Sequence, residues 1–196
     1  MVAYVFDKLL ATGIRSGQVP ARTKAARSWF RDSAASMARV SRQGLVSDKD
    51  RLRSSVLIGG MYMFFYDPKY KKTLPYYDRF PLVVVIERYK DGFLGLNLHY
   101  LPPVARAKLM DALYTISNNK KYDETTRMRV SYDMLKSASK FRGYKPCVKH
   151  YLNEHLRSKL AYVNATEWDI ALFLPTEQFK KAGTSEVWAD SKQRMR

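Results

Sequence analysis

The strongest constraint on the fold is a short apolar run in the middle of the chain, Pro81-Leu-Val-Val-Val-Ile86. β-Branched residues without polar alternation are typical of a strand that is covered on both faces. The turn residues Lys90-Asp91-Gly92 follow, and the next predicted strand, Phe93–Leu101, alternates large apolar residues with smaller or polar ones. These segments predict an antiparallel hairpin in an α+β fold, built on a small twisted antiparallel sheet or a partly open barrel.

Further elements are expected on both sides of this hairpin. The aromatic run Met61–Tyr66 predicts another strand, and the long connection 69–80 is expected to fold back across the sheet. C-terminal helices that pack on the sheet are predicted at 104–116, 131–141 and 147–160. Thr166 and Asp169 have the spacing of a capping box before a further helical segment at 170–174. The tail is predicted to be a surface strand or loop that Phe179 and Trp188 anchor.

The N-terminal segment has the least capacity to form a core of its own. Between Arg15 and Arg42 it carries seven basic residues and one acid, and a thin basic helix is predicted at 21–38. Alone, such a segment buries too little apolar surface to offset its chain entropy. We therefore expect an extended basic arm that lies against its own domain or a neighbouring chain. The predicted division is an arm at 1–55, a core domain at 56–190 and a C-terminal tail at 191–196.

The charge of the chain points to a polyanionic or acidic partner. The 196 residues include 35 Lys and Arg against 18 Asp and Glu, a net charge of +17. Basic residues that alternate with aromatic ones suit a phosphate backbone, although acidic proteins select the same composition. Both partners remain open. The candidate nucleic-acid or subunit-binding residues are Arg22, Lys24, Arg27, Arg31, Arg39 and Arg42 in the arm, and Lys140, Arg142, Lys145 and Lys149 in a second patch.

Motifs for metal binding or catalysis are weak. Cys147, His150 and His155 have a spacing unlike that of structural zinc ligands, and we expect a buried cysteine and two surface histidines. The acids are scattered, without the convergent carboxylates of a metal-dependent nuclease. The sequence predicts a non-enzymatic protein without metal or cofactor, and a DNA nuclease is the alternative from another class. With one cysteine and no signal-peptide or membrane-spanning pattern, we expect a soluble protein made in a reducing compartment.

Asn97 and His99 allow two interpretations. They can hydrogen-bond backbone groups of the folded-back loop 74–79, with Gly95 permitting a close approach. Alternatively, their face of the strand is a recognition surface. The first interpretation is favoured, because buried polar side chains mostly satisfy nearby backbone groups.

Three longer segments carry a resemblance to a known family. They are Gly59-Gly-Met-Tyr-Met-Phe-Phe-Tyr-Asp-Pro68, Leu74-Pro-Tyr-Tyr-Asp-Arg-Phe-Pro-Leu82 and Gly92-Phe-Leu-Gly-Leu-Asn-Leu-His-Tyr-Leu-Pro-Pro103, and the shorter segments 106–113 and 168–175 fit the same pattern. The chain resembles the DNA end protector family of T-even-like tailed phages over most of residues 10–190. These motifs contain no catalytic set to transfer.

The resemblance implies a role and partners. It implies a late-acting structural protein of the virion, a head-completion protein that contacts packaged double-stranded DNA ends and neighbouring portal, neck or tail subunits. A baseplate or tail-hub subunit that binds acidic protein neighbours is the nearest alternative. The expected location is the virion, after synthesis in the host cytoplasm and without contact with a membrane.

Overall fold

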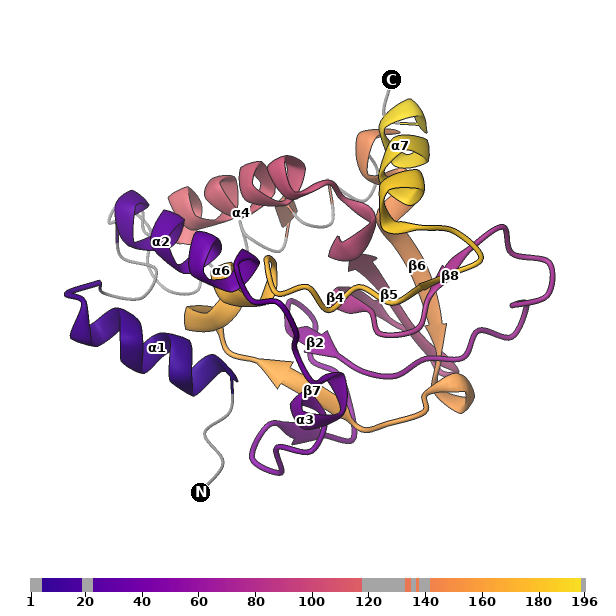
Figure 1. Ribbon diagram of the computed structural model, residues 1–196. Helices are drawn as coiled ribbons and strands as arrows, with labels where there is room; N and C mark the ends of the chain where they lie inside the picture. Colours follow the sequence, from indigo (N-terminus) through magenta and orange to yellow (C-terminus); the bar gives the residue numbers. More distant parts are fainter. Residues whose placement is uncertain (1–4, 19–22, 118–132, 135–136, 138–141, 195–196) are drawn as a thin grey trace.

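A six-stranded antiparallel sheet lies at the centre of the protein (Figure 1). The computed structural model describes residues 5–18, 23–117, 133–134, 137 and 142–194. In spatial order the sheet is β1-β7-β2-β4-β5-β6, so it is open and not a closed barrel. Its strands are β1 (Leu52–Arg53), β2 (Met61–Met63), β4 (Leu82–Arg88), β5 (Gly92–Asn97), β6 (Val148–Leu152) and β7 (Leu160–Val163). A separate two-stranded sheet pairs β3 (Tyr77–Asp78) with β8 (Phe179–Lys180).

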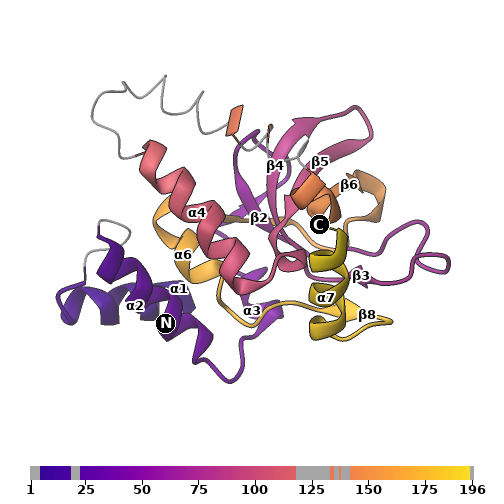
Figure 2. The same ribbon diagram turned by 90° about the horizontal axis from the view of Figure 1, so that it is seen from above.

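Figures 1 and 2 show that helices α1, α2, α4 and α6 gather at one side of the sheet, while α7 lies apart from them. The α-helices in the described residues are α1 (Val5–Arg15), α2 (Lys24–Ala35), α3 (Arg42–Leu45), α4 (Pro103–Ser117), α6 (Trp168–Ala171) and α7 (Thr184–Arg194). Short 3-10 turns are η1 (Leu98–Tyr100), η2 (Arg142–Cys147), η3 (Asn153–His155) and η4 (Ala165–Glu167). None of the helices in the described ranges is both long and apolar enough to cross a membrane.

The strand β4 is buried on both faces from Leu82 to Ile86, as its apolar run predicts. Val84 and Ile86 belong to the larger buried cluster, which also takes side chains from α2, α4 and α6. Val83 and Val85 point to the opposite face, into a smaller cluster rich in aromatic rings. This second cluster contains Val56, Tyr62, Phe64, Tyr66, Val83, Val85, Phe93, Tyr151 and Leu160. Two layers of apolar contacts explain why this strand needs no polar alternation.

The predicted hairpin is present, although its second strand is shorter than expected. Tyr89 N–H donates to the Gly92 carbonyl at 2.8 Å, which closes the turn between β4 and β5. A side chain at Gly92 would place its Cβ 2.0 Å from the Tyr151 carbonyl oxygen, so only glycine fits there. The strand ends at Asn97, whose side chain accepts a hydrogen bond from His99 N–H and caps η1. The prediction of strand through Leu101 is therefore wrong after Asn97.

The N-terminal segment packs onto the rest of the protein. The predicted helix 21–38 is present as α2, which Thr23 caps by accepting from Ala26 N–H at 3.1 Å. Phe6 of α1 and Phe30 of α2 are each 2% exposed and share the larger cluster with strand residues. That cluster crosses the boundary predicted at residue 55. An extended arm is not confirmed, because these aromatic anchors supply the buried surface that composition alone does not reveal.

The C-terminal predictions need several corrections. The helix predicted at 147–160 is wrong, since β6 and η3 occupy most of that range and β7 begins at Leu160. Tyr151 stacks on Phe93 of β5 with 5.4 Å between ring centroids, a contact distant in sequence that favours a strand. The capping box is formed by Asn164 and Glu167, not by Thr166 and Asp169. The tail, predicted to be a strand or loop, contains β8 and then helix α7. The helix predicted at 131–141 falls mostly outside the described residues.

Candidate nucleic-acid interface

Two arginines of the predicted arm point inward and form ion pairs with the core. Arg27 Nε donates to Asp169 Oδ2 at 2.7 Å, and Arg31 Nε donates to Asp169 Oδ1 at 2.7 Å. Both guanidinium groups also contact Asp111, at 3.0 Å from Arg27 and 2.8 Å from Arg31. The spacing of four residues puts both side chains on one face of α2, facing α4 and α6. Sequence reasoning placed these charges on a partner-binding surface, whereas here they join helices.

The electrostatics of this cluster favour the charged forms of Arg31 and Asp111. Burial alone would lower the pKa of Arg31, but hydrogen bonds and charge attraction from Asp111 and Asp169 raise it overall. Burial would likewise raise the pKa of Asp111, and the arginines, Arg31 first, lower it overall. Arg31 and Asp111 therefore both stay charged at neutral pH, and the cluster contributes to the fold as a set of charge-assisted hydrogen bonds.

The other candidates of the first group are divided between two environments. Arg42 donates from Nε to the Thr176 carbonyl and from Nη2 to the Glu177 carbonyl, each at 2.8 Å, so it ties α3 to the segment before β8. Lys24 and Arg39 are exposed. Arg22 lies outside the described residues.

The second predicted patch is also divided. Lys145 is exposed in η2, whereas Lys149 lies with its Nζ 4.3 Å from the centre of the Tyr100 ring. Burial lowers the pKa of Lys149. Arg142 begins η2, and Lys140 lies outside the described residues. The structure thus brings Lys149 onto an aromatic face and leaves Lys145 in solvent.

Within the described residues, the buried ion pairs remove as many acids as bases from the surface. Four arginines with little exposure pair with four acids that are also buried or nearly so: Arg27, Arg31, Arg51 and Arg106 with Asp48, Glu167, Asp169 and Glu177. Setting these aside from the 35 basic and 18 acidic residues leaves 31 basic and 14 acidic ones. These pairs are therefore neutral as a group, and the excess positive charge of the chain lies elsewhere.

Asn97 and His99 take part in a buried polar chain. His99 Nδ1 lies 2.7 Å from Asp78 Oδ2, and its Nε2 lies 3.2 Å from Thr176 Oγ1. Asn97 Nδ2 donates to the same Asp78 oxygen at 3.2 Å. The predicted partner segment is right, but the acceptor is the Asp78 carboxylate and not backbone. Gly95 faces Val83 of β4, so the expectation that it admits the loop is wrong.

The order Asp78–His99–Thr176 has the form of a catalytic triad, yet burial assigns it to the fold. Thr176 and His99 are each 0% exposed, so no substrate reaches the hydroxyl group. Burial would raise the pKa of Asp78, but the charge and hydrogen bond of His99, with further donors, lower it overall. The chain links β3, η1 and the segment before β8.

The predicted burial of Cys147 is confirmed, because the side chain is 0% exposed and burial raises the pKa of its thiol to about 12. His150 is exposed, with its ring centroid 5.1 Å from that of Tyr89. His155 Nδ1 lies 2.8 Å from the Asp67 carbonyl oxygen. Within the described ranges, no three His, Cys, Asp or Glu side chains gather in a metal-binding arrangement.

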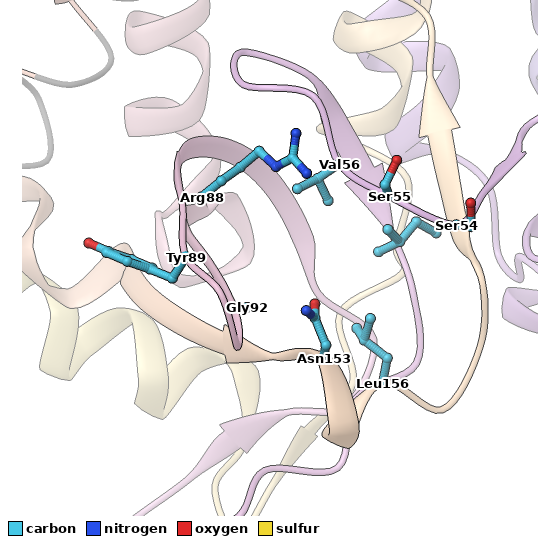
Figure 3. A pocket seen from close by; sticks show the side chains of 9 residues that line it. Ser54, Ser55, Val56, Arg88, Tyr89, Gly92, Asn153 and Leu156 are labelled. Atoms are coloured by element: carbon cyan, nitrogen blue, oxygen red, sulfur yellow. The ribbon is translucent and has the colours of Figure 1, made fainter.

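A surface hollow that sequence reasoning missed lies on the other side of the sheet. It has a volume of about 320 Å³ and opens between the β4–β5 hairpin, the segment after β1 and the turn η3 (Figure 3). Its lining residues are Ser54, Ser55, Val56, Arg88, Tyr89, Gly92, Asn153, Leu156 and Leu160. The one feature of the sequence that points to this hollow is Arg88, an arginine at the end of an apolar strand. The walls come from segments about 100 residues apart, so local patterns could not assemble them.

Comparisons with known proteins identify the family. A family model described as Phage T4 terminal DNA protecting protein matches residues 5–191. No curated protein and no solved structure matches the chain. The match covers almost the whole sequence, in agreement with the resemblance of the segments 59–68, 74–82 and 92–103. This chain belongs to the family of the phage T4 terminal DNA protecting protein.

Proposed function

We propose that this protein binds the ends of phage DNA and shields them, as a structural and non-enzymatic component of the virion. The observation that carries the proposal is the charge distribution, considered together with the family. Because the internal acids neutralise the internal arginines, 31 basic against 14 acidic residues remain for the rest of the chain. A surface with this excess attracts a polyanion and releases the counterions of DNA when it binds.

The exposed members of the two predicted groups are the proposed phosphate contacts. Lys24, Arg39 and Lys145 are exposed, and Lys149 offers its ammonium from the ring of Tyr100. Arg22, Lys140 and Arg142 belong to the same proposal from the sequence alone. Arg27, Arg31 and Arg42 act by holding the fold, since their guanidinium groups are already hydrogen-bonded.

The place of the protein in the particle follows from the same proposal. A protein that shields DNA ends acts after packaging, as a head-completion protein beside portal, neck or tail subunits. Synthesis occurs in the host cytoplasm. A baseplate subunit that binds acidic proteins would use the same cationic surface, so DNA binding has to be measured directly.

Protection of free ends is the experiment that tests the proposal. The full chain is mixed with linear duplex DNA and, separately, with DNA of equal length whose ends are closed by hairpins. A processive exonuclease is then added to the linear DNA, and the surviving fraction is measured. We expect protection of the open DNA, and tighter binding to open than to closed ends. Equal binding to both DNAs without protection would refute end binding, and no binding to either DNA would favour an acidic protein partner.

The salt dependence of binding provides a second measurement. Changing Lys24, Arg39 and Lys145 to alanine should lower the slope of log affinity against log salt by about 0.9 for each phosphate that is no longer neutralised. Ser28→Ala on the exposed side of α2 is the matched control and should leave the slope unchanged. Shortening of DNA by the protein with magnesium alone would favour the nuclease alternative instead.

A further inference from the structure

A bulge in the β4–β5 hairpin decides which charge faces the hollow. The pairing register shifts between Val85 and Glu87, so that Glu87 pairs with Leu94 and Arg88 pairs with Phe93. Leu94 packs against the larger cluster, whereas Phe93 belongs to the smaller one. Cross-strand partners share a face of the sheet, so Arg88 lies on the face of the hollow and Glu87 on the other. If side chains had alternated regularly after Val85, Glu87 would face the hollow and Arg88 would face away from it.

The hollow presents Arg88 together with neutral hydrogen-bonding groups. Figure 3 shows the Arg88 side chain on one side, with Ser55 and Asn153 on the others. In the described part of the chain, Arg88 forms no ion pair with an acid. Apolar side chains of Val56 and Leu156 also contribute to the lining. This combination of one guanidinium, hydroxyl and amide donors and an apolar wall suits a phosphate attached to a nucleoside.

Hydrogen bonds hold the walls in place. The buried Tyr62 hydroxyl accepts from Leu57 N–H at 2.9 Å, and Gly59 N–H donates to the Val85 carbonyl at 2.7 Å. On the opposite wall, Asn153 N–H donates to the Asp91 carbonyl at 2.9 Å. Binding to such a surface costs little ordering of the protein.

A second arginine adds to the positive potential. Arg53 precedes the lining residue Ser54, and its guanidinium carbon lies 5.9 Å from the centre of the Tyr162 ring. Burial raises the pKa of Tyr62, and the charges of Arg53 and Arg88 both oppose that shift. Both guanidinium groups are therefore close enough to add to the positive potential on the side of the sheet where Tyr62 lies.

We propose that the hollow bordered by Arg88 receives the terminal phosphate of a DNA end. The inference rests on the proposed function and names its recognition site. A volume of about 320 Å³ is at the small end of ligand sites, so it admits one phosphate-bearing nucleotide and not a length of duplex. Only at an end does the strand continue on one side of the phosphate and not on both, so the site discriminates ends from interior DNA.

Exposed apolar residues beside the hollow suit the other unique feature of an end. Leu57 and Ile58 are 65% and 50% exposed and follow the lining residues Ser54–Val56 directly. The last base pair of a duplex presents an apolar face that interior pairs hide by stacking. Contact between that face and Leu57 or Ile58 would position the terminal phosphate for Arg88.

The test compares DNA ends that differ only in their phosphates. Duplexes of one sequence are prepared with 5′-phosphate, with 3′-phosphate or with hydroxyl groups at all ends, and binding is measured for the full chain, Arg88→Gln and Arg79→Gln. Arg79 is an exposed arginine outside the hollow, so its replacement removes the same charge. We expect about tenfold tighter binding to one phosphorylated end than to hydroxyl ends, as a charge-assisted hydrogen bond provides. Arg88→Gln should abolish that difference, and Arg79→Gln should retain it.

The outcomes separate the inference from the proposed function. Equal binding to phosphorylated and hydroxyl ends, with open ends still preferred over hairpin-closed ones, would overturn the inference and leave end protection intact. Equal losses for Arg88→Gln and Arg79→Gln on every DNA would overturn it as well. If free inorganic phosphate competes with the phosphorylated end at the same concentration as that DNA, the hollow is a site for the free ion, and the inference is overturned too. Near-wild-type thermal unfolding of Arg88→Gln is expected, because Arg88 is exposed.

Discussion

Replacing Asp169 with asparagine tests whether ion pairs hold the N-terminal helices on the protein. Asp169 accepts hydrogen bonds from both Arg27 and Arg31, and the side chains of Arg27 and Asp169 are 6% and 9% exposed. Removing one partner of a buried pair typically costs about 3–5 kcal/mol, because a charge is left desolvated. Asp111 remains within 3.0 Å of both guanidinium groups and is half exposed. We therefore expect a loss near the lower limit, about 3 kcal/mol.

Urea denaturation measures this loss. With a slope of roughly 2 kcal/mol per molar urea, the midpoint should fall by about 1.5 M. Asp32→Asn is the matched control, since Asp32 is exposed on α2 and its replacement changes the net charge equally. The control should change stability by less than about 0.5 kcal/mol. If both variants unfold at the same urea concentration, the ion pairs do not hold α2, and the interpretation of a folded N-terminal segment fails.

Three further outcomes are expected. Gly92→Ala should cost about 2 kcal/mol or more in urea unfolding, because its Cβ would lie 2.0 Å from the Tyr151 carbonyl oxygen. Gly183→Ala meets open space and should cost less, about 1 kcal/mol or below, from the weaker N-cap of α7; equal losses for the two would refute the close approach. Cys147, with a thiol pKa raised to about 12, should resist alkylation at pH 8 until the protein unfolds, and rapid labelling of folded protein would contradict its burial. Asp78 has a lowered pKa in the folded protein. Its contribution to folding stability is therefore complete above its pKa in the unfolded chain, about 4, and is lost as pH falls through its pKa in the folded protein. Wild type should lose more stability from pH 5 to pH 2 than Asp78→Asn, and equal losses would be contrary evidence.

Several elements could be predicted because they depend on short-range patterns. The run at 81–86, the turn at 90–92 and the helical spacing at 104–116 each appear where the sequence indicates. The strand β6 could not be predicted in this way. Its side chains do not differ clearly from those of a helix, and only pairing with β5 and stacking of Tyr151 on Phe93 select the strand.

The candidate site shows the same division. The numbers of basic and acidic residues indicate an excess of positive charge at the surface. Lys24, Arg39 and Lys145 are exposed, as a binding role requires. Counting does not show which arginines have internal partners. Arg27 meets Asp169, which is 142 residues away in the chain, and no local pattern reports such a meeting.

The hairpin, the excess of positive charge and the relationship to phage DNA end protectors could all be inferred from the amino-acid sequence, because they depend on alternation, composition and short motifs. Which of the charges stabilise the fold, and which remain for a partner, depends on contacts between distant segments. The same holds for Arg88, which faces the hollow in place of Glu87 because of a single shift in strand register. Such a choice depends on pairing between strands, so it exists only once the chain has folded.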